Sequence, residues 1–133
     1  MVRLLLGIVS EEEKPRVLLE AARNSLEHAE SHWRSGEYSE AYKRLWASML
    51  LGLEAYAYHR GENPGHGLEW YWSTAGTLSG DVGGEVLDAF YAGLAAFIAS
   101  RESLGDGAHF SMISRRVSEF IEKLGEVLGA EKR

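Results

Sequence analysis

The chain has no cysteine and only two prolines among its 133 residues. Without cysteine there is no disulfide framework, no thiolate metal site and no cysteine nucleophile. This absence agrees with a reducing compartment, and we expect a cytoplasmic protein. Pro15 and Pro64 both suit helix edges or loops rather than helix interiors.

Positive charge and long apolar runs are also scarce. The chain carries 14 basic and 20 acidic residues, a net charge of -6, whereas proteins that grip duplex DNA usually have the opposite balance. The longest N-terminal apolar run, Leu4 to Val9, is far shorter than the ~20 residues that span a bilayer. It is not followed by the small-residue cleavage site of a signal peptide. We therefore expect neither duplex DNA nor a membrane as a partner, and we expect residues 1–9 to pack on the core or on a partner chain.

What the sequence does contain is apolar residues at helical spacing, with no sustained alternation of the kind that makes strands. The spacing predicts helices over residues 10–36, 37–59, 68–78, 85–103 and 109–128. Short loops between them favour antiparallel neighbours. We predict one all-α domain over residues 1–133, a single up-and-down bundle of four to five helices over 10–128, with a tail at 129–133.

Several local features of these helices can be predicted. Ser10 and Glu13 form a capping-box pattern, which predicts that the first helix begins there. The second helix has a wide apolar arc and is expected to be central, with Gly52 marking a close helix crossing. In the fourth helix we expect a stripe of Leu87, Phe90, Leu94 and Phe97. The last helix carries the most regular seam, composed of Phe110, Ile113, Val117, Phe120, Leu124 and Val127.

The best candidate for a ligand site is the glycine-rich loop before the last helix. His109 lies at the start of that helix, where unpaired backbone N–H groups attract anions. Arg101 lies near the end of the preceding helix, and Arg115 and Arg116 follow within two turns. These residues predict an anion site, unless Arg101 only neutralises a helix end and His109 is a cap residue.

Three other groups are weaker candidates. Arg60 and His66 lie in the loop after the second helix, where they either bind phosphate or form a solvated loop. His28 and His32 share a helix face, but a third ligand would have to come from elsewhere, so we assign no metal and no cofactor. The run from Trp70 to Trp72 either stacks on bases or fills the core or an interface.

Two stretches and two histidines carry a family resemblance. The run Trp33-Arg34-Ser35-Gly36-Glu37-Tyr38 is followed by Glu40-Ala41-Tyr42-Lys43-Arg44-Leu45-Trp46-Ala47-Ser48. A loop containing His66 comes next, and the pair His109-Phe110 opens the last helix. Over about Leu18 to Leu124, this order resembles the archaeal PaREP family of small helical proteins, which is similar to the HEPN superfamily of helical bundles.

The resemblance implies a HEPN-like homodimer that binds a nucleotide or an RNA end. Active HEPN proteins are metal-independent ribonucleases with an Arg-x(4–6)-His motif from both protomers. Here seven residues separate Arg101 from His109, and five separate Arg60 from His66. Three hypotheses therefore stay open: a binding module at the Arg101/His109 loop, a ribonuclease with Arg101 and His109 as catalytic residues, and a non-catalytic structural or protein-interaction bundle.

Overall fold

The computed structural model describes residues 6–102, 104 and 107–130. Residues 6–8 form a helical turn. The chain then folds into α2 (Lys14–Arg34), α3 (Tyr38–His59), α4 (Gly67–Val82), α5 (Glu85–Glu102) and α6 (Gly107–Ala130). Within these residues there is no strand, so the all-α prediction is confirmed. Parts of the predicted N-terminal segment, of the loop before the last helix and of the C-terminal tail lie outside the described residues.

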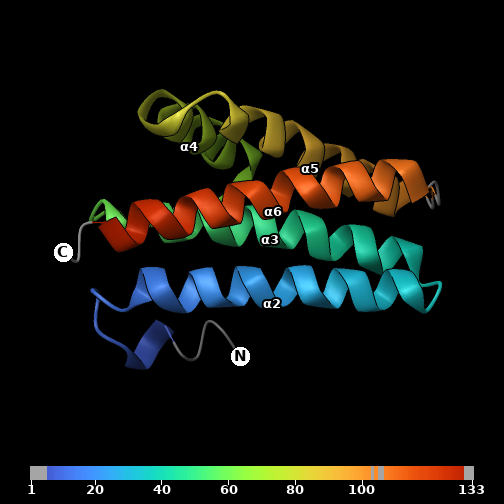
Figure 1. The fold of residues 1–133 in the computed structure, drawn as a ribbon. Helices are drawn as coiled ribbons and strands as arrows, with labels where there is room; N and C mark the ends of the chain where they lie inside the picture. The colour runs from blue at the N-terminus through green and yellow to red at the C-terminus, as the bar shows by residue number, and fades with distance from the viewer. Residues whose placement is uncertain (1–5, 103, 105–106, 131–133) are drawn as a thin grey trace.

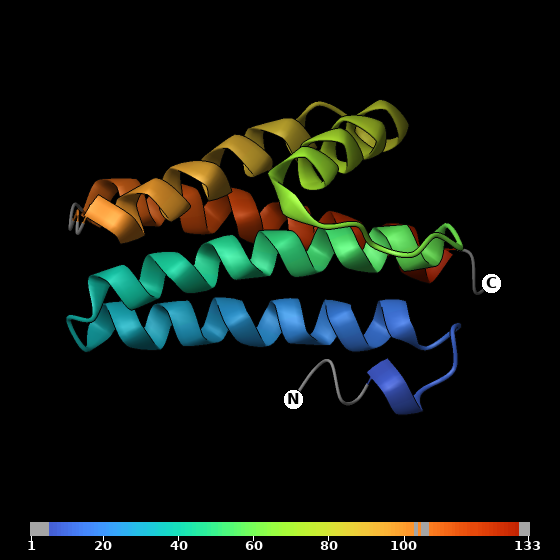
Figure 2. The same cartoon turned by 180° about the vertical axis from the view of Figure 1, so that it is seen from behind.

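Helix α3 is the centre of the molecule, as its wide apolar arc predicts. It packs against α2, α4, α5 and α6, whereas α2 touches only α3 and α6 among these helices. Figures 1 and 2 show α2 and α3 side by side, with α6 along α3 and with α4 and α5 on the side of α3 away from α2. The helices thus pack into one body around α3. No helix of the described residues is long and apolar enough to cross a membrane.

The turn between α2 and α3 is set by glycine. Gly36 has a φ of 79°, and its N–H donates to the carbonyl of Trp33 at 3.0 Å, while the Glu37 N–H donates to the carbonyl of His32 at 2.8 Å. These two bonds satisfy the last carbonyls of α2 in the manner of a glycine-terminated helix. The predicted end of the first helix at Gly36 is confirmed.

Two predicted boundaries are wrong. The first long helix begins at Lys14, and neither Ser10 nor Glu13 makes the side-chain bonds of a capping box: Glu13 is the cap residue and has no such bond. Pro15 fits the first turn because the N–H that it lacks has no partner there. Helix α4 runs on through Gly80 to Val82, because its inner face packs on α5 and α3 and outweighs the low helix propensity of glycine.

The close crossing predicted at Gly52 is confirmed. A Cβ built on Gly52 would lie 2.7 Å from Cε2 of Phe120 and 2.9 Å from Cδ1 of Ile121, so the backbone of α3 touches the side chains of α6 directly. One turn earlier on α3, two buried serines, one from each helix, form hydrogen bonds between α3 and α2. Ser48 Oγ donates to the carbonyl of Ala22 at 2.8 Å, and Ser25 Oγ donates to the carbonyl of Arg44 at 2.7 Å. Small residues therefore bring both neighbours close to α3.

The core confirms the seam of α6 and corrects that of α5. Phe110, Ile113, Val117, Phe120 and Leu124 are all buried, whereas Val127 is only partly so and Leu128 is buried beyond it. In α5 the predicted stripe is right at Phe90 and wrong at Phe97, which is on the surface, while Leu87 and Leu94 are partly buried. The buried face consists of Val86, Ala89, Phe90, Gly93, Ala96, Ala99 and Ser100. Small residues dominate that face because Gly93 lies against Trp46 and Met49 of α3.

Candidate functional site

A cleft opens between α5 and α6 at the end of the bundle where α6 begins. It has a volume of about 450 Å³, and its lining is almost wholly apolar, consisting of Tyr42, Ala95, Ile98, Ala99, Leu104, His109 and Ile113. Among the described residues that line it, side-chain polar groups come from Tyr42 and His109. Such a cleft suits a flat, largely apolar group with few hydrogen-bonding positions.

The position of His109 follows from its neighbour in the sequence. His109 is the third residue of α6, and Phe110 beside it is 3% exposed. The Phe110 ring stacks on Trp33 with 4.2 Å between centroids and meets the edge of Tyr42. This aromatic cluster fixes the first turn of α6 and leaves His109 on the side that faces the cleft.

A second cleft of about 400 Å³ continues along the same two helices. It shares Ala95, His109 and Ile113 with the first, and its other lining residues are Asp88, Tyr91, Ala92, Met112 and Arg116. Arg116 Nη1 lies 3.4 Å from Oδ2 of Asp88. His109 therefore lies between an apolar end and a charged end, and we call the two clefts together the α5–α6 cleft.

A second ion pair lies beyond the charged end of the α5–α6 cleft. Lys123 Nζ lies 3.0 Å from Oε1 of Glu85, at the first residue of α5. The pKa of Glu85 is lowered, first by its own backbone N–H at the helix start and then by Lys123. Acidic residues on α5 thus face basic residues on α6 along this part of the cleft.

Arg101 lies at the edge of the face of α5 that lines this cleft. It comes three residues after Ile98, which turns it by roughly 60° from that lining residue. Its guanidinium lies over the ring of Phe97, 5.7 Å from the centroid, and it lines neither part of the α5–α6 cleft. Arg115 is exposed on α6 and also lies outside that lining. Among the predicted arginines described, the structure brings Arg116 to the same cleft as His109.

Arg60 lies beside a separate, smaller hollow. Arg60 Nη1 donates to the Tyr56 hydroxyl at 3.3 Å, and its Nε lies 3.2 Å from Glu62. Tyr56 in turn donates to Asp81 of α4, and burial, followed by this bond, raises the pKa of Tyr56. His66 is the residue before α4 and does not line the 190 Å³ hollow beside Arg60. The two predicted residues are not brought together here.

The remaining candidates are placed as follows. His32 Nδ1 lies 3.2 Å from Oε1 of Glu37, and no group of three potential metal ligands occurs among the described residues. Tyr71 donates to Glu54 at 2.8 Å and ties α4 to α3. Trp72 is 52% exposed and touches the ring of Tyr91 beside the α5–α6 cleft. The aromatic run is therefore partly a tether and partly surface.

Sequence reasoning missed much of the lining of this cleft, including Asp88, Ile98, Leu104 and Met112. A signal was present, because Ile98, Leu104 and Met112 are large apolar residues that fall outside the predicted apolar stripes.

Comparisons with known protein families, with curated proteins and with solved structures found no match to this chain.

Proposed function

We propose that this protein is a HEPN-like helical module that acts as a symmetric dimer and binds a nucleotide or an RNA end in the α5–α6 cleft. The observation that carries the proposal is the two-ended character of the cleft, apolar around Ile98 and Leu104 and charged around Arg116, with His109 between. A nucleotide has the same division into a flat base and a charged phosphate.

The dimensions of the cleft support this orientation. His109 and Arg116 are seven residues apart on one face of α6, which separates them by roughly 10 Å along the axis. A base beside Ile98 and His109 therefore places its phosphate toward Arg116. The pair between Arg116 and Asp88 is exposed and so contributes no more than ~1 kcal/mol, which leaves Arg116 able to turn to a phosphate.

The surface around the cleft supports a dimer. Tyr91, Ile98, Leu104 and Met112 are between 45% and 53% exposed, although all are large and apolar, and all line this cleft. A contiguous apolar surface of this kind marks an interaction site. A second copy related by a twofold axis would cover it with the same residues and would place two His109 side chains at one interface.

Ligand binding is tested by calorimetric titration with nucleoside monophosphates and with a short RNA. We expect Arg116→Gln to weaken binding roughly tenfold, the effect of losing one charge-assisted contact to the phosphate. We expect His109→Ala also to weaken binding, because it removes the side chain that lies beside the base. Arg101→Gln is the matched control, because Arg101 lines neither part of the cleft, and it is expected to change the affinity less than twofold. A larger loss of affinity with Arg101→Gln than with Arg116→Gln would instead favour a site formed by Arg101 and His109, as the sequence suggests.

The dimer is tested by light scattering at micromolar concentration. The wild-type protein is expected to show twice the chain mass, and Ile98→Glu is expected to reduce it to one chain. Leu68→Glu is the control, because Leu68 is 50% exposed but does not line the cleft. Cleavage of the RNA in the presence of a chelator would favour the ribonuclease. A monomer that binds no nucleotide at millimolar concentration would favour the structural bundle.

A further inference from the structure

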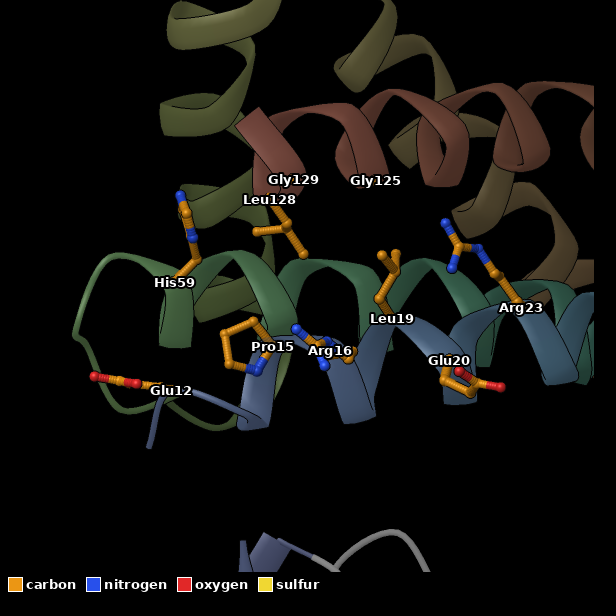
Figure 3. Close-up of a pocket in the computed structure, with 10 residues that line it drawn as sticks. All are labelled: Glu12, Pro15, Arg16, Leu19, Glu20, Arg23, His59, Gly125, Leu128 and Gly129. Carbon is orange, nitrogen blue, oxygen red and sulfur yellow. The ribbon is translucent and has the colours of Figure 1, made fainter. Parts of the chain in front are cut away.

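A third cleft lies against α2, a helix that does not pack against α5. Its volume is about 400 Å³. It lies between the first turns of α2, the last residue of α3 and the last turns of α6, and Figure 3 shows its lining: Glu12, Pro15, Arg16, Leu19, Glu20, Arg23, His59, Gly125, Leu128 and Gly129. The α5–α6 cleft shares none of these residues.

Two arginines of α2 line this cleft without a protein partner. Arg16 and Arg23 are seven residues apart and share one face of the helix. Glu20 lies four residues after Arg16 and three residues before Arg23, and ion pairs often form at both spacings on a helix. Yet neither guanidinium has a hydrogen bond or an ion pair with any residue that the structure describes. In Figure 3 the carboxylate of Glu20 points away from the cleft, whereas Arg23 points toward α6.

The backbone of α6 makes room for Arg23. A Cβ on Gly125 would lie 2.8 Å from Nη2 of Arg23, closer than van der Waals contact allows. Glycine at this position therefore lets the guanidinium lie against the helix. At Gly129, one turn later, a built Cβ would meet no atom within 4 Å.

We propose that the cleft between α2 and the end of α6 binds a phosphate-class oxyanion, either free phosphate or the phosphate of a nucleotide. Two planar guanidinium groups on one face supply the paired N–H donors that fit phosphate oxygens. The first turn of α2 lies in the same wall and adds the positive end of a helix. His59 lines the cleft from the end of α3.

A competing explanation is that these basic residues only balance the negative ends of α3 and α6. Titration with inorganic phosphate and with a nucleoside monophosphate, followed by calorimetry, separates the two explanations. We expect Arg16→Gln and Arg23→Gln each to weaken phosphate binding roughly tenfold. Arg115→Gln removes another exposed arginine, one that lies on α6 outside the cleft, and is expected to leave the affinity unchanged.

Gly125→Ala provides a test in which stability and binding move in opposite directions. Alanine favours the helix and is expected to raise the melting temperature, while its methyl group displaces Arg23 and weakens phosphate binding severalfold. Gly129→Ala is the matched control, since a methyl group there meets nothing within 4 Å and the affinity stays the same.

The outcomes also distinguish this cleft from the proposed nucleotide site. In the Arg116→Gln variant, in which the α5–α6 cleft is weakened, equal affinities for phosphate and for the nucleoside monophosphate indicate a site for the phosphoryl group alone. Tighter binding of the nucleotide by this variant indicates that the cleft between α2 and the end of α6 also holds the base. Loss of phosphate binding in Arg116→Gln but not in Arg23→Gln would overturn the inference. The inference would also be overturned if no phosphate bound at a concentration of about 10 mM, because a dissociation constant above that value is too weak for a functional site.

Discussion

The contact between Gly52 and α6 makes a sharp prediction about stability. Gly52 lies in the middle of α3, and a methyl group there would approach Cε2 of Phe120 to 2.7 Å and Cδ1 of Ile121 to 2.9 Å. Ordinary carbon–carbon contacts lie at roughly 3.5–4.0 Å. Both partners are buried, so α6 must move away from α3 or Phe120 must leave its rotamer.

The expected cost follows from two opposing effects. Overpacking a core by one methyl group destabilises a fold by roughly 1–3 kcal/mol. Replacing glycine by alanine inside a helix stabilises the helix by up to ~1 kcal/mol, which offsets part of this cost. Gly52→Ala is therefore expected to lower the free energy of unfolding by about 1–2 kcal/mol.

Gly76→Ala is the matched control for this prediction. Gly76 lies inside α4, and a Cβ built there meets nothing within 4 Å. Alanine at this position therefore raises the helix propensity without a clash. We expect it to raise the free energy of unfolding by ~0.5–1 kcal/mol. Urea unfolding followed by circular dichroism measures both variants. If Gly52→Ala stabilises the protein as much as Gly76→Ala does, then α3 and α6 do not cross at Gly52.

Three further predictions follow from the core and from the shifted pKa values of Tyr56 and Glu85. Phe120→Ala is expected to cost ~3–5 kcal/mol in urea unfolding, because the ring is buried in the middle of the α6 seam. The pKa of Tyr56 is raised above its ordinary 10.0, so the stability that it contributes is present below pH 10 and lost as pH rises through the folded value. Tyr56→Phe is expected to cost ~1 kcal/mol at neutral pH, and melting curves should show less alkaline destabilisation than in the wild type. The pKa of Glu85 is lowered from 4.5, so its contribution is present above that value and lost as pH falls through the folded value. The melting temperatures of Glu85→Gln and the wild type should therefore differ at pH 6 and converge toward pH 3.

Much of the fold could be predicted because the helical spacing in the sequence survives in the structure. The central position of α3 and its crossing at Gly52 follow from a wide apolar arc interrupted by one glycine. The start of α2 could not be read from Ser10 and Glu13, since a capping pattern is local and the chain reaches a regular helix only at Lys14. The length of α4 depends on packing against α5, which short-range propensity does not contain.

The site could be predicted only in part. The place of His109 at a helix start is a property of the sequence, and the structure confirms it. Whether Arg101 or Arg116 shares its cleft depends on how α5 is rotated against α6, which the spacing within either helix does not determine. The cleft of Arg16 and Arg23 was beyond sequence reasoning, because its other wall, at Gly125, lies about a hundred residues away in the chain.

The most direct test of the proposed nucleotide site is a titration of the isotope-labelled protein with adenosine monophosphate, followed by the backbone amide resonances. The account predicts that the amides of Ala95, His109, Ile113 and Arg116 shift together and saturate with one dissociation constant, and that Arg116→Gln weakens this response while Arg23→Gln leaves it intact. Saturation of the protein with these four amides unmoved would contradict it.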